Sequence, residues 1–149
     1  YPQQVQHVAN LLSRPPLNRK CTFALDYTGC GRPVADMFYR AGLRPQNILI
    51  TAGNEVTHHN GDTWHVPKQM LISGLEARLH SGELRIAAAL TEAGALAEEL
   101  KDFARKVSDA GRVTFSARSG KHDDLVLAVA IALFCSLNRN ECSIEPFPF

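Results

Sequence analysis

Acidic side chains stand at two places in this sequence where a protein could bind a metal ion. Asp26 directly follows Cys21–Leu25, a short apolar run with the composition of a buried strand. Asp123 and Asp124 begin a stretch that is apolar on nearly every side up to Leu137. Because α/β sheets carry ligand sites at the carboxyl ends of their strands, we expect these acids at the rim of the core. Converging carboxylates would suit Mg²⁺ or Mn²⁺, which prefer oxygen ligands.

These carboxylates predict a particular reaction. Two divalent ions about 4 Å apart can activate a water molecule and stabilise the leaving oxygen during phosphodiester cleavage. We therefore predict Asp26, Asp123 and Asp124 as metal ligands and catalytic residues, with His122 beside the pair to orient a phosphate or a water. Another explanation stays open for each acid. An Asp at a helix start caps free N–H groups, and an Asp before a glycine-rich turn forms an Asx-turn.

Four basic side chains are candidates for contacts to DNA phosphates. They are Arg32, Lys68, Arg118 and Lys121. Basic side chains are also typical of a solvated surface, so either explanation fits these four residues.

Two further patterns could bind a ligand but have simpler explanations. The turn over residues 26–32 runs into a helix and could hold a phosphate on its backbone amides. Neither G-x-x-x-x-G-K-[ST] nor G-x-G-x-x-G occurs, so its glycines are expected to serve turn geometry. His58, His59 and His65 cluster in a polar segment, where solvated histidines are more common than zinc ligands.

The composition limits the class of protein. The chain has 149 residues with 16 basic and 15 acidic side chains, so its net charge of +1 gives no global field for DNA, and any such contact must be local. Four cysteines without C-x-x-C spacing predict free thiols rather than a zinc site or a disulfide framework. We find no apolar run long enough for a membrane helix and no secretion signal, and expect a cytoplasmic protein. A start at Tyr1 suggests a piece of a longer chain.

Hydrophobic spacing predicts alternating helices and strands. Helices are expected over 2–13, 32–41, 67–82, 91–107 and 123–137, and strands over 21–25, 46–51, 84–86 and 113–117, with a loop or hairpin over 53–65. This alternation is typical of an α/β fold with a mostly parallel sheet. We predict one domain over residues 1–137 and an irregular tail over 138–149.

Four segments resemble motifs of bacteriophage and prophage terminase large subunits, in the order found in that family. Leu25–Asp36 resembles "D-x-T-G-x-G-x-x-V-x-D". Val66–Ile72 followed by Gly82–Ile86 is similar to "VPK…L(I/V)…G-x-L-x-I", and Glu98–Phe103 to "E-L-x-x-F". Ser119–Ala128 resembles "G-x-HDD-L-V-x-A". The matches cover nearly the whole chain to about residue 134.

The resemblance implies an RNase H-like nuclease domain, a three-layer α/β fold with a mixed, mostly parallel central sheet. In that family the domain cuts concatemeric viral DNA during genome packaging, with two Mg²⁺ or Mn²⁺ ions held by three acids. Asp26 matches the second acid, and the Asp123–Asp124 pair matches the third. The first acid lies on an earlier strand, and no acidic residue precedes Asp26 here. We therefore expect the N-terminal strands to be missing and this chain alone to be weakly active or inactive.

The partners implied are double-stranded DNA, the terminase ATPase domain, the small terminase subunit and the portal, in a bacterial host cell and without a membrane. A sheet lacking its first strands would expose an edge, so self-association is also expected. One departure from the family is Cys30, which stands where a small aliphatic residue is usual.

Two alternatives stay open. The chain could be a non-catalytic module that docks on DNA or on packaging partners. It could also be another RNase H-fold nuclease, such as a junction resolvase, with Asp26 as the first acid and Glu55 or Asp62 as further carboxylates.

Overall fold

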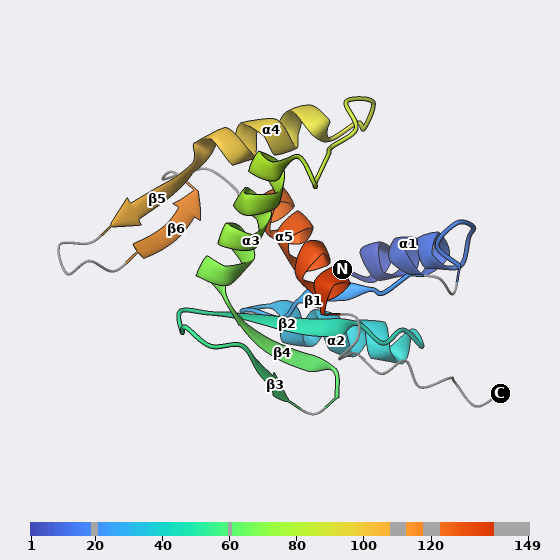
Figure 1. Ribbon diagram of the computed structural model, residues 1–149. Coiled ribbons are helices and arrows are strands. Elements are labelled where there is room, and N and C mark those ends of the chain that lie inside the picture. Colours follow the sequence, from blue (N-terminus) through green and yellow to red (C-terminus); the bar gives the residue numbers. More distant parts are fainter. Residues whose placement is uncertain (19–20, 60, 108–112, 118–122, 139–149) are drawn as a thin grey trace. The chain divides into compact units, whose positions relative to one another are not determined.

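The fold is α/β, as predicted, and it separates into two compact units (Figure 1). The computed structural model describes residues 1–18, 21–59, 61–107, 113–117 and 123–138. The N-terminal unit comprises Tyr1–Thr51 and Glu55–Val66, and the C-terminal unit comprises Ala52–Asn54 and Pro67–Phe149. The single domain predicted over residues 1–137 stays a prediction.

A mixed, mostly parallel sheet of four strands organises the N-terminal unit. Its strand order is β1-β2-β4-β3, with β1 over Ala24–Asp26, β2 over Gln46–Thr51, β3 over Thr57–His59 and β4 over Thr63–Pro67. Strands β1 and β2 are parallel, with Asp26 paired to Ile48. Strands β3 and β4 form an antiparallel hairpin. The strand predicted over 46–51 and the hairpin within 53–65 are therefore confirmed.

Two helices accompany this sheet. Helix α1 covers Pro2–Leu12, and α2, over Gly31–Arg40, connects β1 to β2 and contacts both β1 and α1. A parallel pair needs such a crossover, because its strands run in the same direction. The core contains Phe38 of α2, which meets Phe23 edge to face with ring centroids 4.8 Å apart, and the buried side chains of Ile48 and Trp64.

Helices dominate the C-terminal unit. Helix α3 covers Lys68–Ser81, α4 covers Ala93–Asp102 and α5 covers Asp124–Leu137, and α5 packs against both of the others (Figure 1). The buried residues of α5 recur at helical spacing, so they form one continuous face that packs against α3 and α4. The buried side chains are Leu71, Ile72 and Leu75 of α3, Leu96 of α4, and Val126, Ala130, Ile131 and Cys135 of α5.

The prediction of one helix over 91–107 is wrong. Helix α4 ends at Asp102, and the next residues form β5, Phe103–Val107, which pairs antiparallel with β6, Val113–Ala117. Apolar residues at 96, 100, 103 and 107 fit a helical period. In an extended chain Phe103, Arg105 and Val107 share one side, so the local pattern does not give a purely apolar strand face. Pairing with β6 supplies hydrogen-bond partners along β5, and this tertiary contact overrides the local pattern.

The strand predicted over 84–86 is also wrong. In the structure this segment is irregular, and the backbone N–H of Leu84 donates to the carbonyl oxygen of Arg78 at 3.0 Å. The segment therefore closes the end of α3 instead of joining a sheet. The irregular tail predicted over 138–149 lies outside the described residues beyond Asn138. Among the helices that the structure describes, none has the length and apolar character needed to cross a membrane.

The packing of α5 predicts unequal costs for two truncations on the same helix. Ile131 is 4% exposed and Leu137 is 53% exposed. We expect Ile131→Ala to lower the free energy of unfolding by about 2–5 kcal/mol, because it leaves a cavity, and Leu137→Ala to lower it by much less. Urea unfolding followed by circular dichroism measures both. Equal costs would show that α5 does not pack as described.

Candidate functional site

Asp26 lies at the end of β1, with its side chain exposed. Its Oδ1 accepts the backbone N–H of Thr28 at 2.8 Å, which forms an Asx-turn. The Asx-turn, the structural explanation for an Asp at this position, is therefore present in the molecule. The bond uses Oδ1 and leaves Oδ2 outside the turn, so the Asx-turn and a role as a metal ligand are compatible.

The rest of this turn is explained by backbone geometry. The Thr28 Oγ1 accepts the backbone N–H of Ile50 at 3.0 Å, which ties the turn to β2. Gly29 has a φ of +58°, which favours glycine. A Cβ on Gly31 would lie 2.3 Å from the carbonyl oxygen of Asp26, so only glycine fits. These contacts support the expectation that the glycines serve turn geometry.

Arg32, a predicted DNA contact, lies on the exposed side of α2. Its guanidinium carbon lies 5.7 Å from the centroid of the Tyr27 ring, a cation–π distance. The contact holds the guanidinium beside the Asp26 turn. Its binding to DNA stays a prediction.

Asp123 is the N-cap residue of α5, but its side chain makes no capping hydrogen bond. Its Oδ2 instead accepts a hydrogen bond from the Lys68 Nζ at 2.7 Å. The two side chains are 24% and 29% exposed, so solvent only partly screens the ion pair. Lys68 is the first residue of α3, and the pair therefore joins the starts of two helices. The expectation that Asp123 caps its own helix is wrong.

The cap of α5 comes from another helix. Glu99 of α4 accepts the backbone N–H groups of Leu125 and Val126 on its Oε2, at 2.9 and 3.1 Å. These are two of the amides that have no acceptor within α5. The sequence patterns indicate no chemical role for Glu99. Its only signal in the sequence was its position in the segment similar to "E-L-x-x-F".

Three of the family-like segments therefore meet at the start of α5. Lys68 comes from the "VPK" segment, Glu99 from the "E-L-x-x-F" segment and Asp123 from the "HDD" segment. Asp124 is exposed in the first turn of α5. The other predicted residues near this point, His122, Arg118 and Lys121, lie outside the described residues.

These donors fit a hard divalent cation in kind but not in number. Carboxylate oxygens are the ligands that Mg²⁺ and Mn²⁺ prefer. Within the part of the chain that the structure describes, however, no group of three His, Cys, Asp or Glu side chains is placed to hold one metal ion. Asp123 is engaged by Lys68, and the Oε2 of Glu99 by two amides. The convergence of Asp26, in the other unit, with the pair at 123–124 stays a prediction.

The histidines of the polar segment lie on the β3–β4 hairpin and contact one another or a neighbouring ring. His58 stacks on Trp64 with ring centroids 4.1 Å apart, and its Nε2 lies 3.0 Å from the carbonyl oxygen of Gly61. His59 lies against His65 at 4.3 Å. Ring stacking thus accounts for their clustering.

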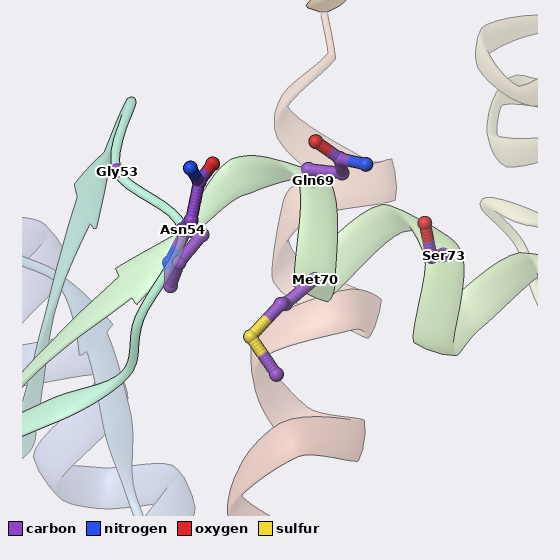
Figure 2. Close-up of a pocket in the computed structure, with 6 residues that line it drawn as sticks. Gly53, Asn54, Gln69, Met70 and Ser73 are labelled. Atoms are coloured by element: carbon purple, nitrogen blue, oxygen red, sulfur yellow. The ribbon is translucent and has the colours of Figure 1, made fainter. Parts of the chain in front are cut away.

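An open pocket of about 310 Å³ lies at the start of α3 (Figure 2). Figure 2 shows Asn54 on one side and Gln69, Met70 and Ser73 of α3 on the other. Gly53 and Pro67 complete the lining, which contains neither a carboxylate nor a cationic side chain. The pocket therefore contains none of the predicted site residues.

No protein-family model, curated protein or solved structure matches the chain at a significant level.

Two glycine substitutions, one in the Asp26 turn and one in α3, are predicted to change stability in opposite directions. Gly31→Ala forces a methyl group against a backbone carbonyl, so we expect the free energy of unfolding to fall by about 3 kcal/mol. Gly74→Ala, within α3, meets no atom within 4 Å and should raise it by about 0.5–1 kcal/mol through helix propensity. Denaturant titration tests both. A neutral Gly31→Ala would contradict the turn geometry.

The Lys68–Asp123 ion pair predicts a measurable coupling energy. In a double-mutant cycle with Lys68→Met and Asp123→Ala, we expect about 1 kcal/mol or more, because the pair is partly buried. The matched control is Lys101 and Glu98 of α4, also 2.7 Å apart but 71% exposed on each side. Their hydrogen bond and mutual charge raise the pKa of Lys101, yet solvent screening should leave no measurable coupling. Similar coupling energies for the two pairs would show that partial burial does not strengthen the Lys68–Asp123 ion pair.

Proposed function

We propose that this chain is part of an RNase H-like, metal-dependent DNA endonuclease domain of the terminase large-subunit type. Its substrate would be concatemeric viral double-stranded DNA during genome packaging. The main support is that three segments similar to that family's motifs contact one another in the C-terminal unit. Lys68, Glu99 and Asp123 are far apart in sequence, and their side chains all bind at the start of α5. Motif residues that share one site are expected to converge in this way.

The roles of the residues follow from their chemistry. Asp26, Asp123 and Asp124 would provide oxygen ligands for Mg²⁺ or Mn²⁺, and His122 would orient a phosphate or a water. When bound, the ions would lower the pKa of a water and stabilise charge on the leaving oxygen. Arg32, Lys68, Arg118 and Lys121 would neutralise DNA phosphates, which position a substrate without reading its sequence.

The remaining parts of the proposal follow from the resemblance. A further acid on an earlier strand would complete the ligand set, because the described acids are too few to hold the ions alone. The ATPase domain, the small subunit and the portal would be partners in the bacterial cytoplasm, and a second copy of the chain could pair along the β1 edge. An RNase H-like arrangement in three layers is likewise part of this proposal.

One observation favours a second candidate, a docking module without catalysis. Asp26 and Asp123 both have structural partners, in the Asx-turn and in the ion pair with Lys68. Such a module needs these acids for its fold alone. The nuclease is preferred because three family-like segments converge at the start of α5, as residues that share one site would do.

Plasmid nicking in Mn²⁺ separates the two candidates. We expect a chain extended at its N-terminus by the strand with the first acid to nick DNA, and this chain alone to nick weakly or not at all. Asp26→Asn and Asp124→Asn in the extended form should lower the rate by about 100-fold or more, which corresponds to about 2.7 kcal/mol. Glu76→Gln, an exposed acid on α3, is the control. An extended chain that does not cut, with acid variants that bind Mn²⁺ like wild type, would exclude the nuclease.

A further inference from the structure

The pocket at the start of α3 is polar but carries no charge. All six lining residues belong to the C-terminal unit: Gly53, Asn54, Pro67, Gln69, Met70 and Ser73. Figure 2 shows Asn54 across from α3, where Gln69 and Ser73 share one face because they are four residues apart. Lys68 stands between two lining residues in the sequence, but its Nζ is bound to Asp123. A ligand that depends on charge, such as a free phosphate or a carboxylate, therefore has no ionic partner in the lining.

Three side chains of the lining are available for hydrogen bonds to a ligand. The carboxamides of Asn54 and Gln69 and the hydroxyl of Ser73 are exposed, and none of them bonds to another residue in the described part of the chain. Each carboxamide presents an N–H donor beside a C=O acceptor. This pair complements a ligand edge on which a donor and an acceptor are also adjacent, as on a nucleobase. The lining thus favours a neutral ligand with such an edge.

Met70 gives the pocket an apolar wall that suits a flat ring. Its side chain borders the pocket and is 49% exposed. A thioether makes favourable contacts with aromatic rings. The volume of about 310 Å³ is at the lower end of the range of small-molecule sites, so the pocket suits one ring system and not a base pair. A nucleobase satisfies both the carboxamides and the thioether, whereas a peptide amide satisfies only the carboxamides.

We propose that this pocket binds one unpaired adenine base. Adenine presents its N6 amino donor beside the N7 acceptor, the edge that Asn and Gln side chains recognise with two hydrogen bonds. Asn54 and Gln69 bind the polar edges of the base from the two sides of the pocket, and Met70 packs against the ring. The base belongs either to a free nucleoside or to a DNA strand. The inference goes beyond the proposed nuclease and does not depend on it, because the lining contains none of the residues assigned to cleavage.

Strands that differ by a single base test the proposal in DNA. The probe is a fluorescein-labelled single strand of abasic sugar–phosphate units with one dA at its centre, compared with the same strand without any base. Both strands carry the same phosphates, so the part of the affinity that is independent of sequence is equal. We expect the full chain to bind the dA strand about 10-fold or more tighter in fluorescence anisotropy, the effect of one two-bond contact to a base. Equal affinities overturn the proposal, and a dG strand that binds as tightly as the dA strand overturns the choice of adenine.

Substitutions in the pocket show where the base binds. Asn54→Leu and Gln69→Leu roughly keep the side-chain size but remove both hydrogen-bonding groups. Gln4→Leu is the matched control, because Gln4 is an exposed glutamine of α1 outside the pocket. We expect each pocket variant to reduce the preference for dA to about 3-fold or less, and Gln4→Leu to keep it. All three positions are exposed, so the circular dichroism spectra should match that of wild type. Pocket variants that keep the preference place the base elsewhere and overturn the proposal.

Free adenosine distinguishes the two sources of the base. Calorimetric titration with adenosine, and with ribose as the control, measures binding without a phosphate. Adenosine binding that Gln69→Leu abolishes shows that the free nucleoside is enough, and a preference confined to the dA strand shows that the base has to be part of DNA. If neither probe binds in a way that depends on Gln69, the proposal is overturned. Plasmid nicking by the extended chain is measured separately, so this failure leaves the nuclease proposal standing.

Discussion

The first turn of a helix has backbone N–H groups that no residue of the same helix can accept, and the C-terminal unit is organised around this requirement. Glu99 meets it for α5 from a neighbouring helix. One turn before Glu99, Leu96 is buried, so α4 contributes an apolar contact and a polar one close together. The hydrogen bonds fix which point along α5 meets α4.

The N-terminal unit uses the same principle in its turn after β1. A side-chain oxygen of Asp26 and one of Thr28 each accept a backbone N–H that lies outside a regular strand pair. Gly31 permits the chain to fold back closely enough for these bonds to form. In the N-terminal unit a residue that looks chemical in the sequence, Asp26, satisfies the backbone, whereas in the C-terminal unit Glu99 does so and Asp123 binds Lys68. A catalytic role, where present, is added to that structural one.

Sequence patterns predicted the parts of the fold that local physics decides. Residues 46–51 form a strand because an apolar run lies in the sheet interior, and α3 begins after Pro67 and ends before Gly82, as expected for helix boundaries. The division of 91–107 into a helix and a strand was not predictable, because its apolar residues follow the helical period and pairing with a distant strand overrides that pattern. The contacts of Glu99 and Lys68 could not be predicted either. They join segments dozens of residues apart, and no local spacing encodes such a meeting.

The position of Trp64 has a practical consequence for optical measurements. It is the only tryptophan of the chain, it is 4% exposed in β4, and its indole Nε1–H donates to Gln46 Oε1 at 3.2 Å. Its emission therefore reports the environment inside the N-terminal unit, where the His58 ring covers one of its faces. Comparing it with far-ultraviolet ellipticity, to which all the helices contribute, would reveal whether the two units melt together or in sequence.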